Sequence, residues 1–506
     1  MNSRPNLLIL MADQLSALAL PCFGDRVAKT PHIDALAGRA VLFDAAYCNS
    51  PLCAPSRGAL TYGSLPSRTG VYDNAAEFPS QVPGYAHYLR HAGYRTILTG
   101  KMHFCGPDQL HGFEERLTTD IYPADYAWTP DWTDFVSRPD WYHSMESVIQ
   151  AGPCARTNQI DFDEEVSFTA QQKLFDIARG NDRRPFCMVA SFTHPHDPFT
   201  ITDEYWNRYA DADIPPPRIT APAMDAHARR LRHVIGMDLQ AVTPTQVQAA
   251  RHAYYAEISY FDDHVGRIMA ALRAAQLDGR TIVIVIADHG EMLGERGLWY
   301  KMNFHEPAAR VPLVVHAPWL FAPRRVAAAV SLADLLPTLA AIAHDGRAPD
   351  YAAAIDGRSL LPHLSGNGGH DEAIGEYLAE GVVVPMVMIR HGAEKFIHAP
   401  GDDDQLYDVA NDPDEQVNLA ADPAHAFRVD AYRAEVARRW DLAALHAAVV
   451  ESQRRRRFVV ASLRSGEQSA WDWQPPRDAS RMYVRHHLPL EELEAMARFP
   501  KWRPPS

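Results

Sequence analysis

Cysteine is scarce in this sequence, with six residues in a chain of 506. They are too sparse for a disulfide-stabilised scaffold and lack the paired spacing of a zinc site, so we expect a reducing compartment. A secretion signal is also lacking, because the first residues lead directly into the apolar stretch 6–11 without a basic segment or a small-residue cleavage site. Together these absences predict a cytoplasmic protein.

Long apolar runs and excess basic charge are missing as well. No stretch approaches the roughly 20 apolar residues that a membrane span requires, so no membrane partner is expected. The 49 Lys and Arg residues are outnumbered by 63 Asp and Glu, which gives a formal net charge of −14. A protein this acidic repels phosphate backbones unless basic groups gather locally, and nucleic acid is therefore not an expected partner.

The composition that remains is typical of a globular enzyme, 47% hydrophobic and 22% charged. Largely apolar runs at 6–11, 184–192 and 281–287 are typical of strands buried on both faces of a parallel or mixed sheet. Between them, 246–275 carries apolar residues at three- and four-residue intervals, which predicts a long helix packed on the sheet. The pattern indicates an α/β fold in which helices surround a large sheet.

The sequence changes in character after about Gly369. Segments 382–389 and 395–398 resemble hairpin strands joined by a turn, and the stretch 401–418 is rich in turn residues. A long tail then follows. We predict three parts: a catalytic α/β domain at 1–369, a smaller C-terminal α+β subdomain at 370–450 and an extended tail at 451–506.

The tail opens with four consecutive arginines at 454–457 and continues with aromatic and proline-rich sequence. We interpret the arginines as a solvated or ion-paired helix face, because the overall acidity disfavours a nucleic-acid site. Tryptophan and tyrosine gain free energy by burial, so the tail is expected to dock on its own subunit or on a neighbouring one.

Two of the predicted strands are followed directly by an acid, Asp13 after the first run and Asp288 after the third. The carboxyl ends of strands form the usual ligand edge of an α/β sheet, and His289 comes next in the chain. Two carboxylates and an imidazole can converge there on one divalent cation. Either Asp alone would more readily be a helix or turn cap, but a pair on one edge favours the metal site.

A second cluster begins at Cys53, in the sequence Cys-Ala-Pro-Ser-Arg. Pro55 suits the first turn of a helix and Gly63 suits its end, so we expect Cys53 at a helix amino terminus. Free amide groups and the helix dipole favour an anion such as a sulfate ester there, and Arg57 can turn toward the same anion. On composition alone, Cys53 would be a buried structural cysteine.

The motif Cys-x-Pro-Ser-Arg, with Leu-Thr-x-Gly downstream, resembles the signature that formylglycine-generating machinery recognises in the sulfatase family of the alkaline phosphatase superfamily. The resemblance implies the alkaline-phosphatase-like fold, a large mixed sheet between layers of helices. It also implies a formylglycine-generating enzyme as a maturation partner, which converts Cys53. The metal ligands that it implies are Asp13, residue 53, Asp288 and His289.

Further positions match the family in order along the chain. Lys101 and His103 match its Lys-x-His, His196 matches its Pro-His, and Lys301 matches the lysine after the second metal motif. Singly, each is more readily a surface lysine or a hydrogen-bonded structural histidine. Jointly, beside the signature, they predict a positive pocket in an acidic protein.

Two departures from the family pattern point to a branch of it. Gln14 stands where many sulfatases have a second acid, and His289 stands where many have Asn. These changes resemble the choline sulfatase and phosphonate monoester hydrolase branch. They leave the identity of the cation open: Ca²⁺ is the first expectation, and Mg²⁺ and Mn²⁺ are the alternatives.

The mechanism implied by the resemblance is attack of a formylglycine hydroxyl on sulfur, which gives a covalent enzyme sulfate. Arg57, Lys101 and the cation would stabilise charge on the transferring group, with help from Lys301. His196 or Lys301 would protonate the leaving alcohol. His103 would then take a proton from the second hydroxyl and so expel sulfate.

The expected substrate is a small alkyl sulfate ester, choline sulfate first. The tail at about 455–500, with the motifs 471–475 and 482–485, resembles the extension of choline sulfatases, as do 120–122, 128–132 and 141–143. A quaternary ammonium group is usually bound by an aromatic face with nearby carboxylates, although Trp128 would as readily be a packed loop residue. The predicted substrate-binding residues are Asn74, Trp128, His143, Glu376 and Glu380.

Two other functions remain open on the sequence: a promiscuous phosphonate monoester or phosphodiester hydrolase with the same nucleophile, and a non-catalytic anion-binding protein with unmodified Cys53. In the related enzymes the carboxyl extension reaches a neighbouring subunit. The resemblance therefore implies a homo-oligomer, a dimer or tetramer with exchanged tails, in which Glu491 or Glu492 helps to neutralise the ammonium group.

Overall fold

The structure is a computed structural model that describes residues 4–122, 125–139, 141–219, 224–465 and 490–504. Its centre is a mixed eight-stranded sheet with the order β10-β2-β9-β8-β1-β6-β3-β4, in which β9 runs antiparallel to both of its neighbours. The strands are β1 (Asn6–Ala12), β2 (Val41–Tyr47), β3 (Arg95–Gly100), β4 (Glu115–Arg116), β6 (Phe186–Ser191), β8 (Thr281–Ala287), β9 (Leu313–His316) and β10 (Arg324–Ser331).

The three apolar runs expected to be strands are β1, β6 and β8, and they are adjacent in the sheet. Every residue of these three strands is buried, as the near-continuous apolar sequence predicts for strands covered on both faces. Strand β6 begins two residues later than predicted. Arg184 lies before the strand, and its side chain pairs with the Asp182 and Glu114 carboxylates near the surface.

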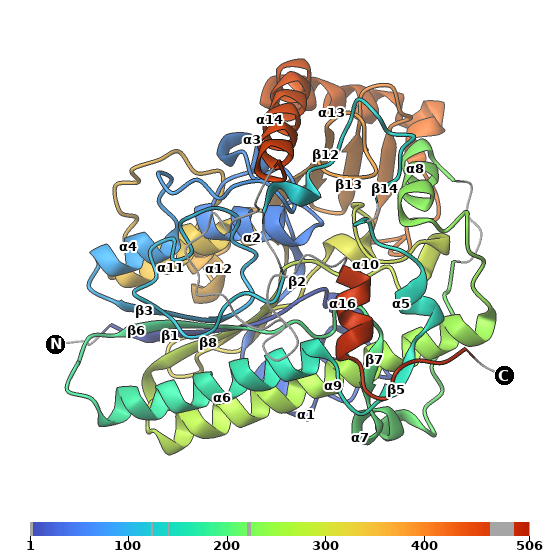
Figure 1. The fold of residues 1–506 in the computed structure, drawn as a ribbon. Coiled ribbons are helices and arrows are strands. Elements are labelled where there is room, and N and C mark those ends of the chain that lie inside the picture. Colours follow the sequence, from blue (N-terminus) through green and yellow to red (C-terminus); the bar gives the residue numbers. More distant parts are fainter. Residues whose placement is uncertain (1–3, 123–124, 140, 220–223, 466–489, 505–506) are drawn as a thin grey trace.

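Helices cover both faces of the sheet (Figure 1). On one side lie α1 (Pro31–Ala37), α6 (Asn158–Arg179) and α9 (Pro244–Ala274); on the other lie α2 (Cys53–Tyr62), α4 (Tyr85–His91) and α11 (Leu335–Ala343). Helix α9 confirms the helix predicted at 246–275. It starts at a capping box in which the Thr243 and Gln246 side chains satisfy each other's backbone N–H groups.

A second, antiparallel sheet has the order β11-β12-β13-β14. Its strands are β11 (Glu372–Tyr377), β12 (Met386–His391), β13 (Glu394–His398) and β14 (Gln405–Asp408), and α13 (Ala426–Arg439) packs against it. The predicted hairpin is thus β12 and β13, although β12 starts at Met386 and not at 382. Strand β14 lies in the stretch whose composition predicts turns alone. These observations agree with the predicted small α+β region.

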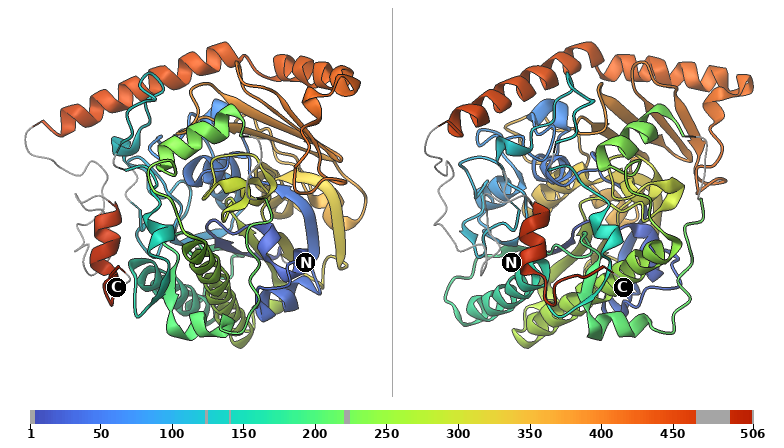
Figure 2. Two further views of the ribbon diagram at one scale, coloured as in Figure 1. Left: turned by 90° about the vertical axis from the view of Figure 1, so that its right-hand side faces the viewer. Right: turned by 45° about the vertical axis from the view of Figure 1, so that its right-hand side comes forward.

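Helix α14 (Leu442–Leu463) runs across the boundary predicted between 450 and 451, and Figure 2 shows it crossing one end of the molecule. The division into three parts stays a prediction. The remaining elements are α3 (Pro66–Thr69), α5 (Glu146–Ile149), α7 (Asp203–Trp206), α8 (Ala226–Ile235), α10 (Glu306–Ala309), α12 (Leu361–Ser365), α16 (Leu490–Ala497), β5 (Gly152–Cys154) and β7 (Thr200–Thr202).

The end of the tail docks on the body of its own chain. The Phe499 backbone exchanges hydrogen bonds with Arg156, and the Arg498 guanidinium donates to the Gln150 carbonyl at 2.9 Å. The motifs 471–475 and 482–485 lie outside the described residues. Within the described ranges, none of the helices combines the length and the apolar character needed to cross a membrane.

Candidate active site

Asp13 and Asp288 lie side by side at one edge of the main sheet. Strands β1 and β8 are parallel neighbours in which Ala12 pairs with Ala287, so each Asp is the next residue beyond its strand. This confirms that the two carboxylates share one sheet edge. Both are fully buried.

Arg57 joins the two carboxylates. Its Nη2 lies 2.8 Å from Asp13 Oδ2 and its Nε lies 2.9 Å from Asp288 Oδ2, while Nη1 donates to Ser191 Oγ at 2.9 Å. All three nitrogens therefore face protein oxygens. The sequence suggested that Arg57 turns toward a bound anion, whereas here Nε and Nη2 contact two different aspartates, so these charge-assisted hydrogen bonds orient both carboxylates.

Cys53 is the first residue of α2, which ends as predicted at Gly63 with a positive φ of 63°. Cys53 Sγ lies 3.2 Å from His289 Nε2 and 3.8 Å from Asp13 Oδ1. One potential ligand atom from each of Asp13, Cys53, Asp288 and His289 lies within 4.8 Å of the others, and all four residues are buried. The tertiary structure thus brings together the four residues that the sequence grouped as metal ligands.

The chemistry of this set suits a hard divalent cation only if residue 53 offers oxygen. Burial, and then the Asp13 carboxylate, raise the pKa of the Cys53 thiol to about 12, whereas an oxygen of formylglycine is the kind of ligand that hard cations prefer. Two carboxylates with one imidazole are acceptable to Ca²⁺, Mg²⁺ or Mn²⁺. The residues present therefore fit a cation together with formylglycine at position 53.

Lys101 supplies positive charge at the same place. Its Nζ lies 2.5 Å from Asp13 Oδ2 and 3.5 Å from Cys53 Sγ, and it faces the Tyr122 ring 4.3 Å from the centroid. Burial would lower the pKa of Lys101, but Asp13 raises it above its usual value, and the ammonium in turn helps to hold the pKa of Asp13 well below its usual value despite burial. We call Asp13, Cys53, Arg57, Lys101, Asp288 and His289 the anion cluster.

His196 and Lys301 form a close pair beside the anion cluster. His196 Nε2 lies 2.9 Å from Lys301 Nζ, and His196 Nδ1 lies 2.6 Å from the Asp197 carbonyl. Burial, followed by the Lys301 charge, lowers the pKa of His196 well below its usual value. A neutral imidazole next to an ammonium group is a suitable arrangement for holding and delivering one proton.

His103 is held with a positive φ of 59° by its backbone N–H, which donates to Asp120 Oδ2 at 2.8 Å. Its buried ring nitrogens have no hydrogen-bond partner among the described residues. Burial, and then the Lys101 charge, lower the pKa of His103 to about 3, so the ring is neutral at pH 7 and able to accept a proton.

Three predicted substrate-binding residues border this machinery, and a fourth, Glu380, is buried where the Lys301 charge acts on it. The Trp128 ring stands edge-on to His103 at 6.1 Å between centroids, and Asn74 Oδ1 accepts the Ala54 N–H at 2.9 Å. His143 lies 6.0 Å from His196 between ring centroids. Burial raises the pKa of Glu380 to about 7, and the charges of Asp73 and Lys301 also act on it. We call Asn74, Trp128, His143 and Glu380 the selectivity wall.

Glu376 is not part of the selectivity wall. Its carboxylate accepts the Ser67 N–H and hydroxyl at 2.7 and 2.6 Å and the Trp440 indole N–H at 2.6 Å. These donors occupy both oxygens, so the carboxylate serves to join β11 to α3 and to the end of α13. The suggestion that it faces the ammonium group is corrected by this packing.

Known protein families agree with this geometry. A family model described as Sulfatase matches residues 5–345, which is more than half of the chain. The chain belongs to the sulfatase family. A second model, described as choline sulfatase enzyme C terminal, matches residues 447–499 of this sulfatase. Family membership confirms the resemblance seen in the sequence, and with it the α/β fold class.

Individual relatives agree. The chain is 44% identical to the choline-sulfatase of Rhizobium meliloti (strain 1021) over 98% of this chain and 99% of the relative. It is 28% identical to the iduronate 2-sulfatase of Homo sapiens over 62% of this chain and 60% of that relative. Among solved structures, the phosphonate monoester hydrolase of Agrobacterium radiobacter superimposes with a TM-score of 0.71 at 26% identity, covering 88% of this chain and 96% of that one.

Three residues of the site in this sulfatase received no role from the sequence. Asp120 fixes the His103 backbone, Tyr122 lies against Lys101, and Gln14 accepts a hydrogen bond from Lys301 through Oε1. Asp120 and Tyr122 belong to a segment that resembles choline sulfatases, and this resemblance was the signal in the sequence that could have indicated their roles. Gln14 Oε1 is also a neutral oxygen beside the metal ligands, and the only signal for it is its departure from the family pattern.

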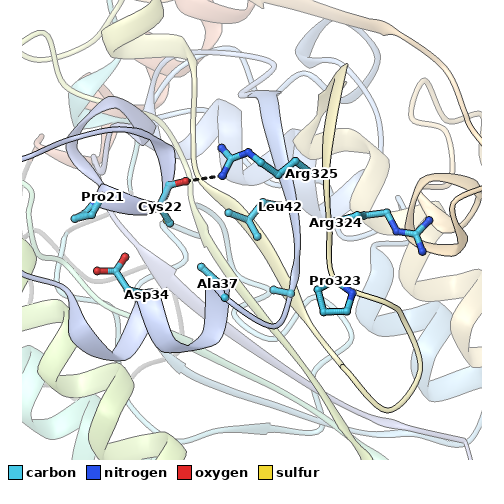
Figure 3. A pocket seen from close by; sticks show the side chains of 10 residues that line it. Pro21, Cys22, Asp34, Ala37, Leu42, Pro323, Arg324 and Arg325 are labelled. Carbon is cyan, nitrogen blue, oxygen red and sulfur yellow. Dashed lines mark hydrogen bonds between the residues drawn. The ribbon is translucent and has the colours of Figure 1, made fainter.

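A cavity of about 550 Å³ lies elsewhere, where β2 and β10 begin (Figure 3). Pro21, Cys22, Asp34 and Arg325 are among its lining residues, and Arg325 donates to the Cys22 carbonyl at 2.9 Å. None of the predicted site residues lines it. Cys22 is no substitute nucleophile, since burial, and then Asp34, raise the pKa of its thiol to about 12.

Proposed function

We propose that this sulfatase hydrolyses choline sulfate to choline and sulfate. The observation that carries the proposal is the adjacency of two unlike surfaces, the anion cluster and the selectivity wall: Asn74 accepts the N–H of the residue after Cys53, and the Trp128 ring stands against His103. A sulfate ester of a quaternary ammonium alcohol has one end suited to each. The 44% identity to a choline-sulfatase supports this substrate.

We propose that Asp13, Asp288, His289 and residue 53 hold one divalent cation, Ca²⁺ first. Sulfatases generally use a metal ion and formylglycine. When bound, the cation supplies Lewis acidity and formylglycine supplies a hydroxyl nucleophile. The remaining chemistry belongs to the protein's own side chains, and a formylglycine-generating enzyme is the maturation partner.

The charged side chains then have separate tasks. Arg57 holds the Asp13 and Asp288 carboxylates in place, and Lys101 faces the nucleophile position with its ammonium group. Lys301, backed by His196, is placed to protonate the leaving alcohol. His103, neutral and with unpaired ring nitrogens in the part of the chain that the structure describes, accepts a proton from residue 53 in the second step.

Steady-state kinetics on choline sulfate and on a phosphonate monoester test this function. We expect kcat/KM to be larger for choline sulfate by roughly 100-fold, because only that ester uses the selectivity wall. The reverse ranking would favour a phosphonate monoester hydrolase, for which the similarity to the Agrobacterium enzyme is the supporting observation. Inactivity on both, with an unmodified Cys53 peptide by mass spectrometry, would favour an anion-binding protein.

We propose further that the chain forms a homo-oligomer through its tail and acts in the cytoplasm. Five of the cysteines, Cys22, Cys48, Cys53, Cys154 and Cys187, are free thiols in the described part of the chain, which supports a reducing compartment. Burial raises the pKa of Glu494 in α16 well above its usual value, so Glu491 and Glu492 remain the candidate tail carboxylates.

Deletion of the chain after Ser465 tests the role of the tail. This cut leaves α14 whole, whereas a cut after Ser452 would remove half of that helix. We expect a smaller assembly by light scattering and a KM for choline sulfate about tenfold higher, with less change for an aryl sulfate. An unchanged assembly and KM would leave the tail with a packing role only.

A further inference from the structure

Arg456 differs from the other arginines of its run. Arg454 and Arg455 pair with Glu451 on the exposed face of α14, and Arg457 pairs with Asp131. These three form the ion-paired helix face expected from the sequence. Arg456 points inward and is only 6% exposed.

The buried Arg456 guanidinium holds two segments at once. Its Nη1 and Nη2 each lie 2.7 Å from one oxygen of the fully buried Asp73 carboxylate, 383 positions earlier in the chain. Nη1 also donates to Thr129 Oγ1 at 3.2 Å. This bidentate, charge-assisted contact is directional as well as strong, so it fixes an orientation and not only a distance.

Each partner of Arg456 is next in sequence to a residue of the selectivity wall. Asp73 precedes Asn74, whose side chain accepts the N–H of the residue that follows Cys53. Thr129 follows Trp128, whose ring stands against His103. A shift of the guanidinium would therefore be passed on to both segments.

One turn earlier, Gln453 gives α14 a second attachment. Its Oε1 accepts the Trp132 N–H at 3.0 Å, and the Trp132 indole donates to the Ala379 carbonyl at 2.9 Å, one residue before Glu380. Gln453 is 2% exposed. The inner face of α14 is thus connected to three of the four segments that carry the selectivity wall.

We propose that Arg456 is a positioning residue for the substrate site: by joining Asp73 to Thr129, it sets the separation of the Asn74 turn and the Trp128 loop beside Cys53. The inference rests on the proposed function, which gives those segments to choline sulfate binding. Arg456 lies within the 447–499 match to the choline sulfatase C terminal. This part of the C-terminal element accordingly acts on the site of its own chain.

The test compares Arg456→Lys with the matched control Arg454→Lys on the same helix. Lysine keeps the charge but cannot make the two-pronged contact. We expect KM for choline sulfate to rise about tenfold in Arg456→Lys, with kcat changed less than about threefold and with unchanged metal content. KM for 4-nitrophenyl sulfate should change less, and Arg454→Lys should match the parent protein.

A double variant separates positioning from stability. Asp73→Asn with Arg456→Met leaves no unpaired buried charge, so it should fold even if Arg456→Lys is unstable. We expect it to show the same rise in KM, and a rise no larger than that of Asp73→Asn alone, because both residues act through one contact. Additive effects, or a parental KM in a folded variant, would overturn the inference.

The parent protein distinguishes the two proposals. A parent that is active on choline sulfate, combined with an Arg456→Lys variant that loses thermal stability but keeps KM within about twofold, overturns the positioning role alone. A parent that is inactive on choline sulfate overturns the proposed function, and this inference with it.

Discussion

The anion cluster and the selectivity wall are built in different ways. The anion cluster lies at the ends of β1, β3 and β8 and in the first half of α2, and its charges contact one another directly, as Asp13 does with Arg57 and Lys101. The selectivity wall lies on connecting segments that are tied down by distant contacts such as Trp132 to Ala379. The ends of regular elements therefore place the nucleophile and the metal ligands, while loops held by distant contacts place the groups that choose the substrate.

The largest expected effect breaks the anion cluster at its nucleophile. Cys53→Ala should lower kcat for choline sulfate by on the order of 10⁴-fold or more, because no other side chain can replace a lost nucleophile. The variant should fold with an unchanged thermal midpoint. Cys187→Ala, which removes a buried thiol from β6, is the control and should keep activity. Near-parental turnover of Cys53→Ala would remove Cys53 from the mechanism.

The next effect concerns the cation. Asp288→Asn should weaken cation affinity by at least about 100-fold, because a buried charged ligand becomes neutral while Arg57 stays beside it. Elemental analysis after gel filtration should find the cation in the parent and not in the variant. Asp44→Asn, which changes a surface partner of Arg325, should retain the metal. Full metal content in Asp288→Asn would show the ligand assignment to be wrong.

His103 tests whether the second step depends on a neutral base. His103→Ala should lower steady-state turnover by about 10²- to 10⁴-fold while leaving the first step, so that a protein carrying covalent sulfate accumulates and is seen by intact mass. The low pKa of His103 also means that its protonation should not inhibit the parent down to about pH 5. Unchanged turnover in the variant would contradict this role.

Substitutions in the selectivity wall should have smaller effects, confined to KM for choline sulfate. Glu380→Gln should raise KM for choline sulfate about tenfold, because an ammonium group loses its carboxylate, but should leave KM unchanged for 3,3-dimethylbutyl sulfate, which lacks the ammonium charge. Glu376→Gln is the control: it should alter stability by about 1–3 kcal/mol through its Ser67 and Trp440 contacts and leave KM unchanged. Equal losses on both substrates would contradict an ammonium contact.

The pKa of Glu380 also predicts how KM for choline sulfate depends on pH. Burial raises it to about 7, so the carboxyl group is protonated and uncharged below that pH and becomes an attractive anion above it. KM for choline sulfate should therefore fall as pH rises from about 6 to 8, and Glu380→Gln should remove this dependence. KM for 3,3-dimethylbutyl sulfate should stay level over the same range.

Local patterns in the sequence determined the parts of the protein that depend on neighbouring residues. The apolar runs located β1, β6 and β8, the helical period located α9, and Pro55 with Gly63 located α2. Because parallel strands end at one edge, the sequence alone placed Asp13 and Asp288 on the same edge of the sheet. The Cys-x-Pro-Ser-Arg resemblance supplied the roles of the surrounding residues, which periodicity alone does not contain.

Only the tertiary structure decided which charged groups meet. In the sequence, Glu376 and Glu380 are equally plausible as carboxylates for the ammonium group. In the structure, Ser67 and Trp440 donate hydrogen bonds to Glu376, whereas Glu380 is buried where the Lys301 charge acts on it. In the same way Arg456, one of four similar arginines, reaches Asp73 across 383 positions. Such partners are set by how helices and sheets pack over long distances in the chain, and local periodicity carries no information about them.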